Sequence, residues 1–366
     1  MIKDFLEVLN KSVKDTSRAE SAEQLEDFVC TYWNARVTKV SVGTSVIRYY
    51  VLVNAKQIDY FLKLTKQFNA HFDTNNVRLS QDGKYVLIEV PNQEKGTYGM
   101  YDCAVALQEI EKKNNELFIS IGEDVSTECI TYNLVDMPHM IVAGQTGSGK
   151  SIFLHNVILS LIMQYTPKEL ELVLIDPKVV EFNFYKGEPH VRELVSSPNK
   201  AGKTVEDLCV EMDNRYKQFA EVGVQDIASY NRKTDKKMSR IVLIIEELAD
   251  LALSSRDDII VNILKLTFKA RACGIHVILC TQRPDSQQLS GKLKNNFQCR
   301  VAFSMASQHD SKTVLGRKGA EVLTGKGDGI FRNNNGTSNI RFQSPLVTEE
   351  EIKRVVEIAK NVYKED

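Results

Sequence analysis

Apolar runs and amphipathic stretches alternate along most of the chain. Four runs are almost wholly aliphatic: residues 140–143, 172–175, 241–245 and 275–280. Such short runs are typical of strands that are buried on both faces of a sheet. Longer stretches between and after these runs have apolar residues at helical spacing: 152–165, 204–223, 257–273 and 349–363. The alternation predicts an α/β domain with a parallel sheet and helices on both of its faces.

The earlier part of the chain has a different pattern. Residues 46–53 are β-branched and aromatic, which predicts a strand, and residues 57–68 have helical periodicity. Two further strands, 77–79 and 85–90, flank a dipeptide Asp-Gly that favours a hairpin turn. We therefore expect a small α+β domain before the larger one. The predicted organisation has four parts: a helical arm (1–35), the small α+β domain (36–115), the large α/β domain (116–346) and a C-terminal helix (347–366).

A glycine-rich segment stands between the first aliphatic run and the helix that follows it. It matches the Walker A pattern of strand, glycine-rich loop, Lys-Ser and helix. Its glycines let successive N–H groups point at phosphate oxygens, and the helix N-terminus adds positive charge. We expect Lys150 to contact the β- and γ-phosphates of ATP and Ser151 to ligate Mg²⁺. The alternative is a turn that binds nothing. The expected nucleotide-binding residues are Gly144, Gln145, Thr146, Gly147, Ser148, Gly149, Lys150 and Ser151.

Polar residues follow the other aliphatic runs. Asp176 follows the second run, Glu246 and Glu247 follow the third, and Gln282 follows the fourth. In parallel α/β sheets, ligands bind at the carboxyl ends of the strands. We predict that Glu246 holds Mg²⁺, that Glu247 orients the attacking water, and that Gln282 senses the γ-phosphate. The alternatives are a solvated carboxylate pair and, for Gln282, a turn residue before Pro284.

Charge and hydropathy limit the possible partners and location. The chain has 47 Lys and Arg against 48 Asp and Glu, a net charge of −1. Overall charge therefore gives no sign of a nucleic-acid partner, and any DNA contact must come from a local basic patch. The first residues lack a signal-peptide pattern, and no window approaches the roughly eighteen consecutive apolar residues of a membrane span. We predict a cytoplasmic protein without a membrane span.

Several motifs together resemble the motor of the FtsK/SpoIIIE DNA translocases. They are MPHMIVAGQTGSGKS, LIDPK, EELADL, KARACGIHVILCTQRP, CRVAF and GAEVLTGKGDGIF. They stand in the family's order, and the resemblance covers about residues 36–346. It implies a RecA-like P-loop ATPase core of the ASCE type, with ATP bound between the subunits of a hexameric ring around double-stranded DNA. The family's membrane-spanning and winged-helix parts have no counterpart in this sequence, so we expect a short form.

The resemblance also implies roles for basic residues. Arg271 matches the family's arginine finger, which stabilises the charge that develops on a neighbouring subunit's phosphoryl group. Arg283, Lys292 and Lys294 match a loop that faces the DNA channel, and Lys312 matches a second such loop. The alternative for each residue is an ordinary basic surface position.

The family usually has Asp at the position of Glu246, and Mg²⁺ is strict about the geometry of its ligands. We expect ATPase activity at an altered rate, because the charge of the carboxylate is kept. The leading hypothesis is an ATP-driven double-stranded DNA translocase. The alternatives are a DNA-transfer coupling or packaging ATPase of a mobile element that docks on a relaxase or portal through residues 1–35, a type VII-like protein-secretion ATPase, and a nucleotide-binding structural subunit.

Overall fold

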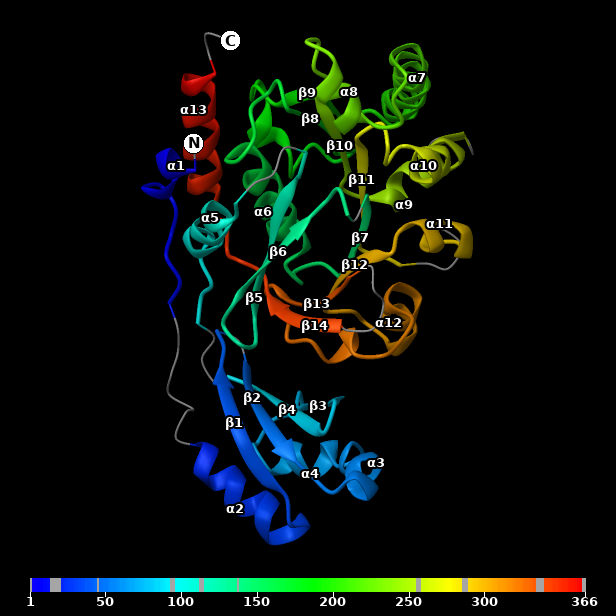
Figure 1. The fold of residues 1–366 in the computed structure, drawn as a ribbon. Coiled ribbons are helices and arrows are strands. Elements are labelled where there is room, and N and C mark those ends of the chain that lie inside the picture. The colour runs from blue at the N-terminus through cyan, green and yellow to red at the C-terminus, as the bar shows by residue number, and fades with distance from the viewer. Residues whose placement is uncertain are drawn as a thin grey trace.

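Two sheets organise the chain. The computed structural model describes residues 2–13, 21–44, 46–92, 96–111, 115–136, 138–254, 258–284, 289–333 and 339–363. Figure 1 shows a large sheet that carries most of the helices and a small sheet at one end of the molecule. Within the described ranges, no helix has the length and apolar character needed to cross a bilayer.

The large sheet has the strand order β6-β5-β14-β13-β12-β7-β11-β10-β8-β9. The six strands from β12 to β9 are parallel, and the other four are joined by antiparallel pairs. The four predicted aliphatic runs form the adjacent strands β7, β11, β10 and β8, which confirms the parallel sheet. The strand bounds are β5 (Phe118–Asp124), β6 (Cys129–Asn133), β7 (His139–Ala143), β8 (Leu170–Ile175), β9 (Val191–Val195), β10 (Arg240–Ile245), β11 (Ile275–Thr281), β12 (Cys299–Phe303), β13 (Asp328–Arg332) and β14 (Asn339–Gln343).

Helices cover both faces of this sheet, which explains why residues 241–245 of β10 are all apolar. Val242 and Ile244 point into one hydrophobic core, whereas Leu243 and Ile245 point into the other. The first core is covered by α1 (Lys3–Leu6), α5 (Met100–Glu109), α6 (Lys150–Ile162) and α13 (Glu349–Val362). The second is covered by α7 (Pro198–Val222), α8 (Ile227–Lys233), α9 (Leu248–Ser254), α10 (Asp258–Lys269), α11 (Gly291–Asn296) and α12 (Gln308–Leu315). Short 3-10 turns are η2 (Asn183–Tyr185) and η3 (Ala320–Val322).

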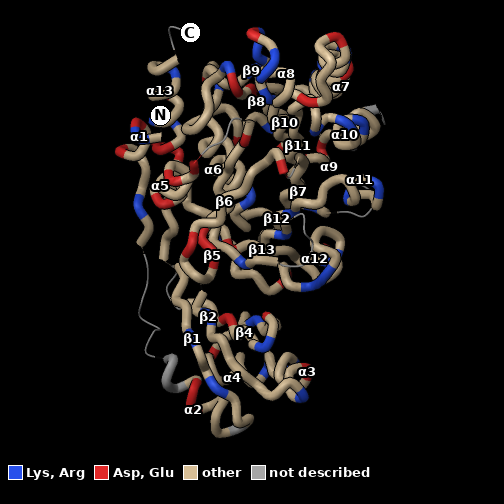
Figure 2. The backbone as a smooth tube through the Cα atoms, in the orientation of Figure 1, with Lys and Arg blue, Asp and Glu red and all other residues tan. Residues whose placement is uncertain are grey.

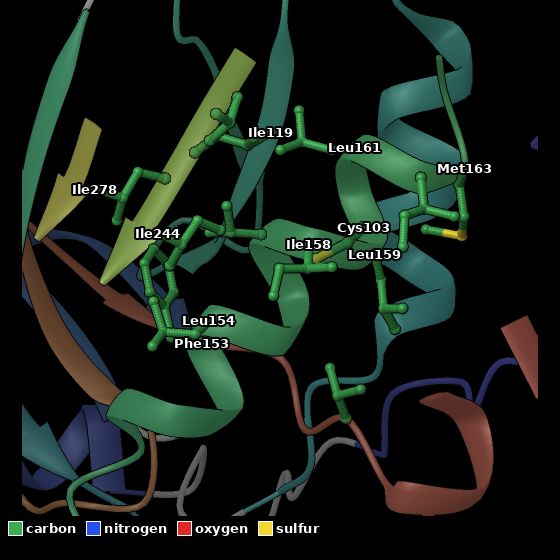
Figure 3. Close-up of a cluster of buried hydrophobic side chains, with 14 of the residues drawn as sticks. Cys103, Ile119, Phe153, Leu154, Ile158, Leu159, Leu161, Met163, Ile244 and Ile278 are labelled. Atoms are coloured by element: carbon green, nitrogen blue, oxygen red, sulfur yellow. The ribbon is translucent and has the colours of Figure 1, made fainter. Parts of the chain in front are cut away.

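Helix α6 is buried almost all round because it lies between the sheet and the outer helices. Figure 3 shows its side chains directed at Ile244 of β10 and Ile278 of β11, with Cys103 of α5 on the outer side. The predicted helices of the large domain are present with shifted ends. The predicted helix 257–273 ends at Lys269, because Gly274, in the left-handed region at φ +76°, turns the chain into β11; residue 257 lies outside the described residues.

The small sheet has the order β1-β2-β4-β3, with helices on one face. The predicted hairpin is confirmed, but the predicted helix 57–68 is broken into three short pieces. Strand β1 was not predicted. The bounds are α2 (Ser21–Trp33), β1 (Arg36–Val42), β2 (Val46–Leu52), η1 (Ala55–Gln57), α3 (Ile58–Phe61), α4 (Thr65–His71), β3 (Arg78–Asp82) and β4 (Tyr85–Pro91).

The predicted arm does not form one unit in the structure. Phe5 of α1 is buried in the core of the large sheet, whereas Leu25 and Val29 of α2 are buried against the small sheet. Helix α5, which lies in the predicted small domain, also packs on the large sheet. We therefore propose that the small domain comprises about residues 21–92, which hold its whole core.

A buried ionic cluster joins the two sheets. Arg48, Glu89 and Arg78 are cross-strand neighbours on the face of the small sheet that has no helices. Both arginines form ion pairs with Glu89, whose side chain is 1% exposed. Arg341 of β14 also binds Glu89, at 3.1 Å, and binds Asp328 of β13 at 2.8 Å. One carboxylate of the small sheet thus accepts from three guanidinium groups, one of them from the large sheet.

Candidate active site

The glycine-rich loop lies between β7 and α6, as predicted. Gly147 and Gly149 have φ of +75° and +108°, which side chains disfavour, so the tight loop requires glycine at both positions. A Cβ at Gly149 would lie 2.4 Å from the backbone nitrogen of Gly327. That nitrogen donates to the Ser148 carbonyl oxygen at 2.8 Å. The turn before β13 therefore packs against the glycine-rich loop and is hydrogen-bonded to it.

Lys150 is the first residue of α6, and its side chain is buried beneath the loop. Its Nζ donates to the backbone oxygen and to Oε1 of Glu246, both at 2.9 Å. Burial alone would lower the pKa of Lys150, but nearby groups, including the carboxylates of Glu246 and Glu247, raise it. The ammonium group is therefore charged at neutral pH and positioned at the strand end where phosphates are expected.

Glu246 has one oxygen available for a metal. Its Oε2 is buried and has no hydrogen-bond partner among the described residues. Burial raises the pKa of Glu246 even though Lys150 acts to lower it, so a further cation would stabilise the carboxylate. Ser151 Oγ, the expected second ligand, donates to Glu181 at 2.8 Å. Carboxylate and hydroxyl oxygens suit Mg²⁺, so these residues fit the ion that the sequence implies.

Glu247 and Gln282 come together at the ends of β10 and β11. The backbone N–H of Gln282 donates to Glu247 Oε2 at 2.9 Å, and the backbone N–H of Ala249 donates to Oε1 at 3.3 Å. Gln282 Oε1 accepts from the hydroxyl of Thr146 in the glycine-rich loop at 3.1 Å. The Glu247 carboxylate is therefore fixed in orientation, and the Gln282 amide contacts the glycine-rich loop; their roles in water activation and phosphate sensing stay predictions.

Glu181 belongs to the site, although the sequence analysis missed it. It lies in the loop after β8, and its carboxylate accepts from Ser151 and approaches His155 Nε2 at 3.7 Å. Its contact with His155 is the largest influence that lowers the pKa of Glu181. Asp176 holds this loop, because its carboxylate accepts from the N–H groups of residues 178, 181 and 182. Asp176 therefore shapes the site without contacting its cavity.

The same loop contains a strained residue. Val179 has a φ of +57°, a conformation that β-branched side chains strongly disfavour, and 54% of it is exposed. We predict that Val179→Asn raises the free energy of unfolding by about 1 kcal/mol, because Asn tolerates this conformation and little apolar contact is lost. Urea unfolding measures the change. Val180→Asn is the matched control, since Val180 is also exposed but has a negative φ; an equal gain there would contradict the strain argument.

A cavity of about 850 Å³ lies over the loop and is large enough for a nucleoside triphosphate. The cavity continues from the glycine-rich loop to Tyr98 and Leu346, whose backbones are hydrogen-bonded to each other. Its lining combines the residues predicted to bind phosphate with apolar side chains such as Tyr98 and Leu346. It includes Tyr98, Gln145, Thr146, Gly147, Gly149, Lys150, Ser151, Glu181, Gln282, Lys326, Pro345 and Leu346.

Arg271 lies at the opposite end of the parallel strands from the glycine-rich loop. It stands between α10 and β11, whereas the far end of β11, at Thr281, pairs with Ala143 before the loop. The seven residues of β11 separate its two ends by roughly 20 Å. Arg271 is exposed and lines a different cavity with Phe268 and Lys269. It therefore cannot reach the nucleotide of its own chain.

The predicted DNA-contacting residues lie outside the nucleotide cavity. Arg283 is exposed and lines an adjoining cavity of about 380 Å³ together with Gln145 and Gln282. Lys292 and Lys294 are on α11, and Lys312 is on α12. Figure 2 shows both helices on the same side of the molecule. The structure thus separates a nucleotide site from a neighbouring basic surface.

Fold and site together define a RecA-like P-loop ATPase core. Comparison with known proteins adds a family: residues 104–286 match the FtsK/SpoIIIE family. Because this match covers half of the chain, the protein belongs to the FtsK/SpoIIIE family.

Individual relatives agree with this assignment. The chain is 36% identical to the DNA translocase FtsK of Staphylococcus aureus over 96% of its length, covering 47% of that relative. It is 36% identical to the DNA translocase FtsK of Caldanaerobacter subterraneus over 96% of its length, covering 50% of that relative. The chain spans about half the length of the curated relatives it matches.

Solved structures share the fold. The conjugation coupling protein TcpA of pCW3, in a monomer form with ATPγS, matches 94% of this chain and 99% of its own, with a TM-score of 0.61 and 24% identity. The cytoplasmic domain of the type VII secretion ATPase EccC of Thermomonospora curvata matches 68% of this chain and 32% of its own, with a TM-score of 0.61 and 23% identity.

Proposed function

We propose that the chain is an ATP-driven double-stranded DNA translocase that works as a hexameric ring with DNA in its central pore. The observation that carries the proposal is the meeting of residues from separate segments at one end of the sheet. Lys150 contacts Glu246, Gln282 contacts Glu247, and Lys150 and Gln282 line one cavity. Relatives that are 36% identical over 96% of the chain are DNA translocases, which supports the DNA substrate.

The proposed reaction assigns a task to each residue. Backbone N–H groups of the glycine-rich loop bind the phosphates, and Lys150 exchanges its contact with Glu246 for phosphate oxygens. Mg²⁺ would be held by Ser151 and Glu246 and would neutralise phosphate charge. Glu247 orients the attacking water and accepts its proton. Because two backbone N–H groups fix its carboxylate, Glu247 needs little reorganisation when the water attacks the γ-phosphate.

A local excess of positive charge supports the DNA partner. Residues 289–333 contain eight Lys or Arg and three Asp or Glu, a net charge of +5, whereas the whole chain has −1. Lys292 and Lys312 are exposed there. Six copies of this segment around a pore would contact phosphates without reading the DNA sequence. We expect ATP turnover to rise when linear duplex DNA is added.

Turnover with and without duplex DNA tests the proposed function. The assay uses the full chain with Mg²⁺ and ATP, and Lys150→Ala serves as the control for contaminating ATPases. Stimulation by duplex DNA, together with displacement of a triplex-forming strand, is the expected result. Turnover that does not respond to DNA would overturn the proposal. Stimulation by a peptide in place of DNA would instead favour protein secretion.

In this proposal Arg271 acts on the nucleotide of a neighbouring subunit, because it cannot reach the nucleotide of its own chain. We predict that Arg271→Ala lowers the maximal turnover about 10³–10⁵-fold and leaves the affinity for ATP unchanged, because the finger acts on charge that develops during the reaction. Lys269→Ala, two residues earlier in the chain, is the matched control. Mixing the Arg271→Ala and Glu247→Gln variants should restore activity, because some interfaces then hold one intact copy of each residue. Failure of the mixture to regain activity would contradict action between subunits.

A further inference from the structure

A basic turn after α12 is not among the predicted DNA contacts. Gly316 ends the helix in the left-handed region at φ +76°, and Arg317 and Lys318 follow on the surface. The side-chain amide of Asn339, with its oxygen oriented toward Arg317, accepts from the guanidinium group. This acceptor is neutral, so it leaves the charge of Arg317 in place. Within the described residues neither side chain forms an ion pair.

Two other guanidinium groups, which come from different sheets, are close enough to repel the charge of Arg317, and Arg332 lies beside Gly316 at the start of the turn. Arg78 belongs to β3 of the small sheet, and Arg332 belongs to β13 of the large one. Burial and then the like charges of Arg78 and Arg332 lower the pKa of Arg317. Arg332 is tied back to α12 through the carbonyl oxygen of Leu315. The turn therefore lies over the junction of the two sheets, beside charges of its own sign.

The carboxylates at this junction do not neutralise it. Glu89 already accepts from three arginines, and Asp328 is bound by Arg341 and by Thr324. Glu321, which lies nearest in the chain, uses its carboxylate for the backbone N–H of Gly319. A neutral N–H leaves the charge of Glu321 in place, so five arginines stand against three carboxylates, Glu89, Asp328 and Glu321. The net charge is +2 before Lys318 is counted. The arginines are Arg48, Arg78, Arg317, Arg332 and Arg341.

The positive charge at this junction lies next to the basic surface that α11 and α12 form. Figure 2 shows Lys and Arg on α11, on α12 and on the facing part of the small sheet, all on one side of the molecule. Duplex DNA carries about one negative charge per 1.7 Å of its axis, so a long basic strip suits it better than a small anion does.

We propose that the turn Arg317–Lys318 contacts the phosphate backbone of duplex DNA and extends the DNA path from α11 and α12 to the small domain. The proposal rests on the proposed function and adds a contact outside the predicted loops. Arg78 and Arg332 raise the positive potential at the turn without touching DNA, since the Arg78 side chain is 11% exposed. The contact is to phosphate, so it does not depend on DNA sequence.

Salt dependence of DNA binding tests the proposal. The affinity of the full chain for a fluorescent 30-base-pair duplex is measured between about 50 and 200 mM salt, with a non-hydrolysable ATP analogue present. Each lost phosphate contact lowers the slope of log K against log salt by about 0.9. We expect Lys318→Gln to lower the slope by about 0.9 and Arg317→Gln with Lys318→Gln to lower it by about 1.8. Lys318→Gln alone keeps the Arg317–Asn339 contact, and unchanged affinity for the ATP analogue shows that each variant is folded.

Lys66→Gln is the matched control, because Lys66 is exposed on α4, which covers the other face of the small sheet. It should leave the slope unchanged. If Lys292→Gln and Lys312→Gln lower the slope but Lys318→Gln does not, the present inference is wrong and the proposed function stands. If none of these variants changes the slope, or if the parent chain does not bind the duplex at any salt concentration, both the present inference and the proposed function are wrong.

Discussion

Replacing Glu247 by Gln is expected to lower ATP turnover about 10²–10⁴-fold and to leave the affinity for ATP unchanged. Gln has nearly the same shape and its oxygen can keep the 2.9 Å contact with the Gln282 N–H, although its NH2 group loses the longer contact with Ala249. The glycine-rich loop and Lys150 make no hydrogen bond with this side chain, so they should keep their positions. It cannot accept the proton of the attacking water, which is the task we propose for Glu247. Steady-state turnover and equilibrium binding of a fluorescent ATP analogue separate the two effects.

Glu181→Gln is the control for this prediction, because Glu181 is a carboxylate that lines the cavity and contacts Ser151, whereas Glu247 contacts Gln282. It should change the Mg²⁺ concentration needed for half-maximal turnover more than the maximal rate. If Glu247→Gln kept the parental rate while Glu181→Gln lost it, the base would be Glu181, and the assignment of the carboxylate pair would be wrong.

The second large effect concerns stability. Glu89→Gln should lower the free energy of unfolding by about 3–5 kcal/mol, because three arginines then share a neutral acceptor in a buried place. Urea unfolding measures the loss. Glu206→Gln is the control, since Glu206 pairs with Lys203 on the exposed face of α7 and should leave the unfolding midpoint unchanged. A parental midpoint for Glu89→Gln would show that the junction is not held by this cluster.

The same cluster predicts a pH dependence. Burial alone would raise the pKa of Glu89, but Arg78, Arg341 and Arg48 hold it at about 2. In the unfolded chain this carboxyl titrates near pH 4.3. Because the folded pKa is the lower one, the stabilisation is complete above about pH 5 and is lost as the pH falls toward 2. The difference corresponds to roughly 3 kcal/mol, and Glu89→Gln should remove this part of the acid sensitivity.

The central strands could be predicted because burial on both faces leaves a purely aliphatic sequence. Strand β1 could not, because its register shifts between Val37 and Lys39, which breaks the alternation of polar and apolar residues. The break between α3 and α4 also has no local signal. Phe61, Leu64 and Phe68 all reach the small core, and no glycine or proline marks the turn.

The site was predictable where function depends on short motifs. Most of the glycine-rich loop and Gln282 line one cavity, and Glu246 and Glu247 are hydrogen-bonded to Lys150 and Gln282. The place of each was expected from its position after an aliphatic run, and their roles stay predictions. Glu181 was missed because it lies six residues beyond the end of β8. Three hydrogen bonds to the carboxylate of Asp176 help to fold this loop back toward Ser151, and such a loop conformation cannot be read from residue types.

Two adjacent residues connect the nucleotide loop with the small domain. Gly327 donates to the Ser148 carbonyl oxygen, and Asp328 binds Arg341, which is held by Glu89. Only one peptide unit lies between the two contacts, and that unit is planar. The turn before β13 is therefore braced on one side by the glycine-rich loop and on the other by the ionic cluster that joins the sheets. A side chain at residue 327, where φ is +89°, would be strained, so this double contact favours glycine there.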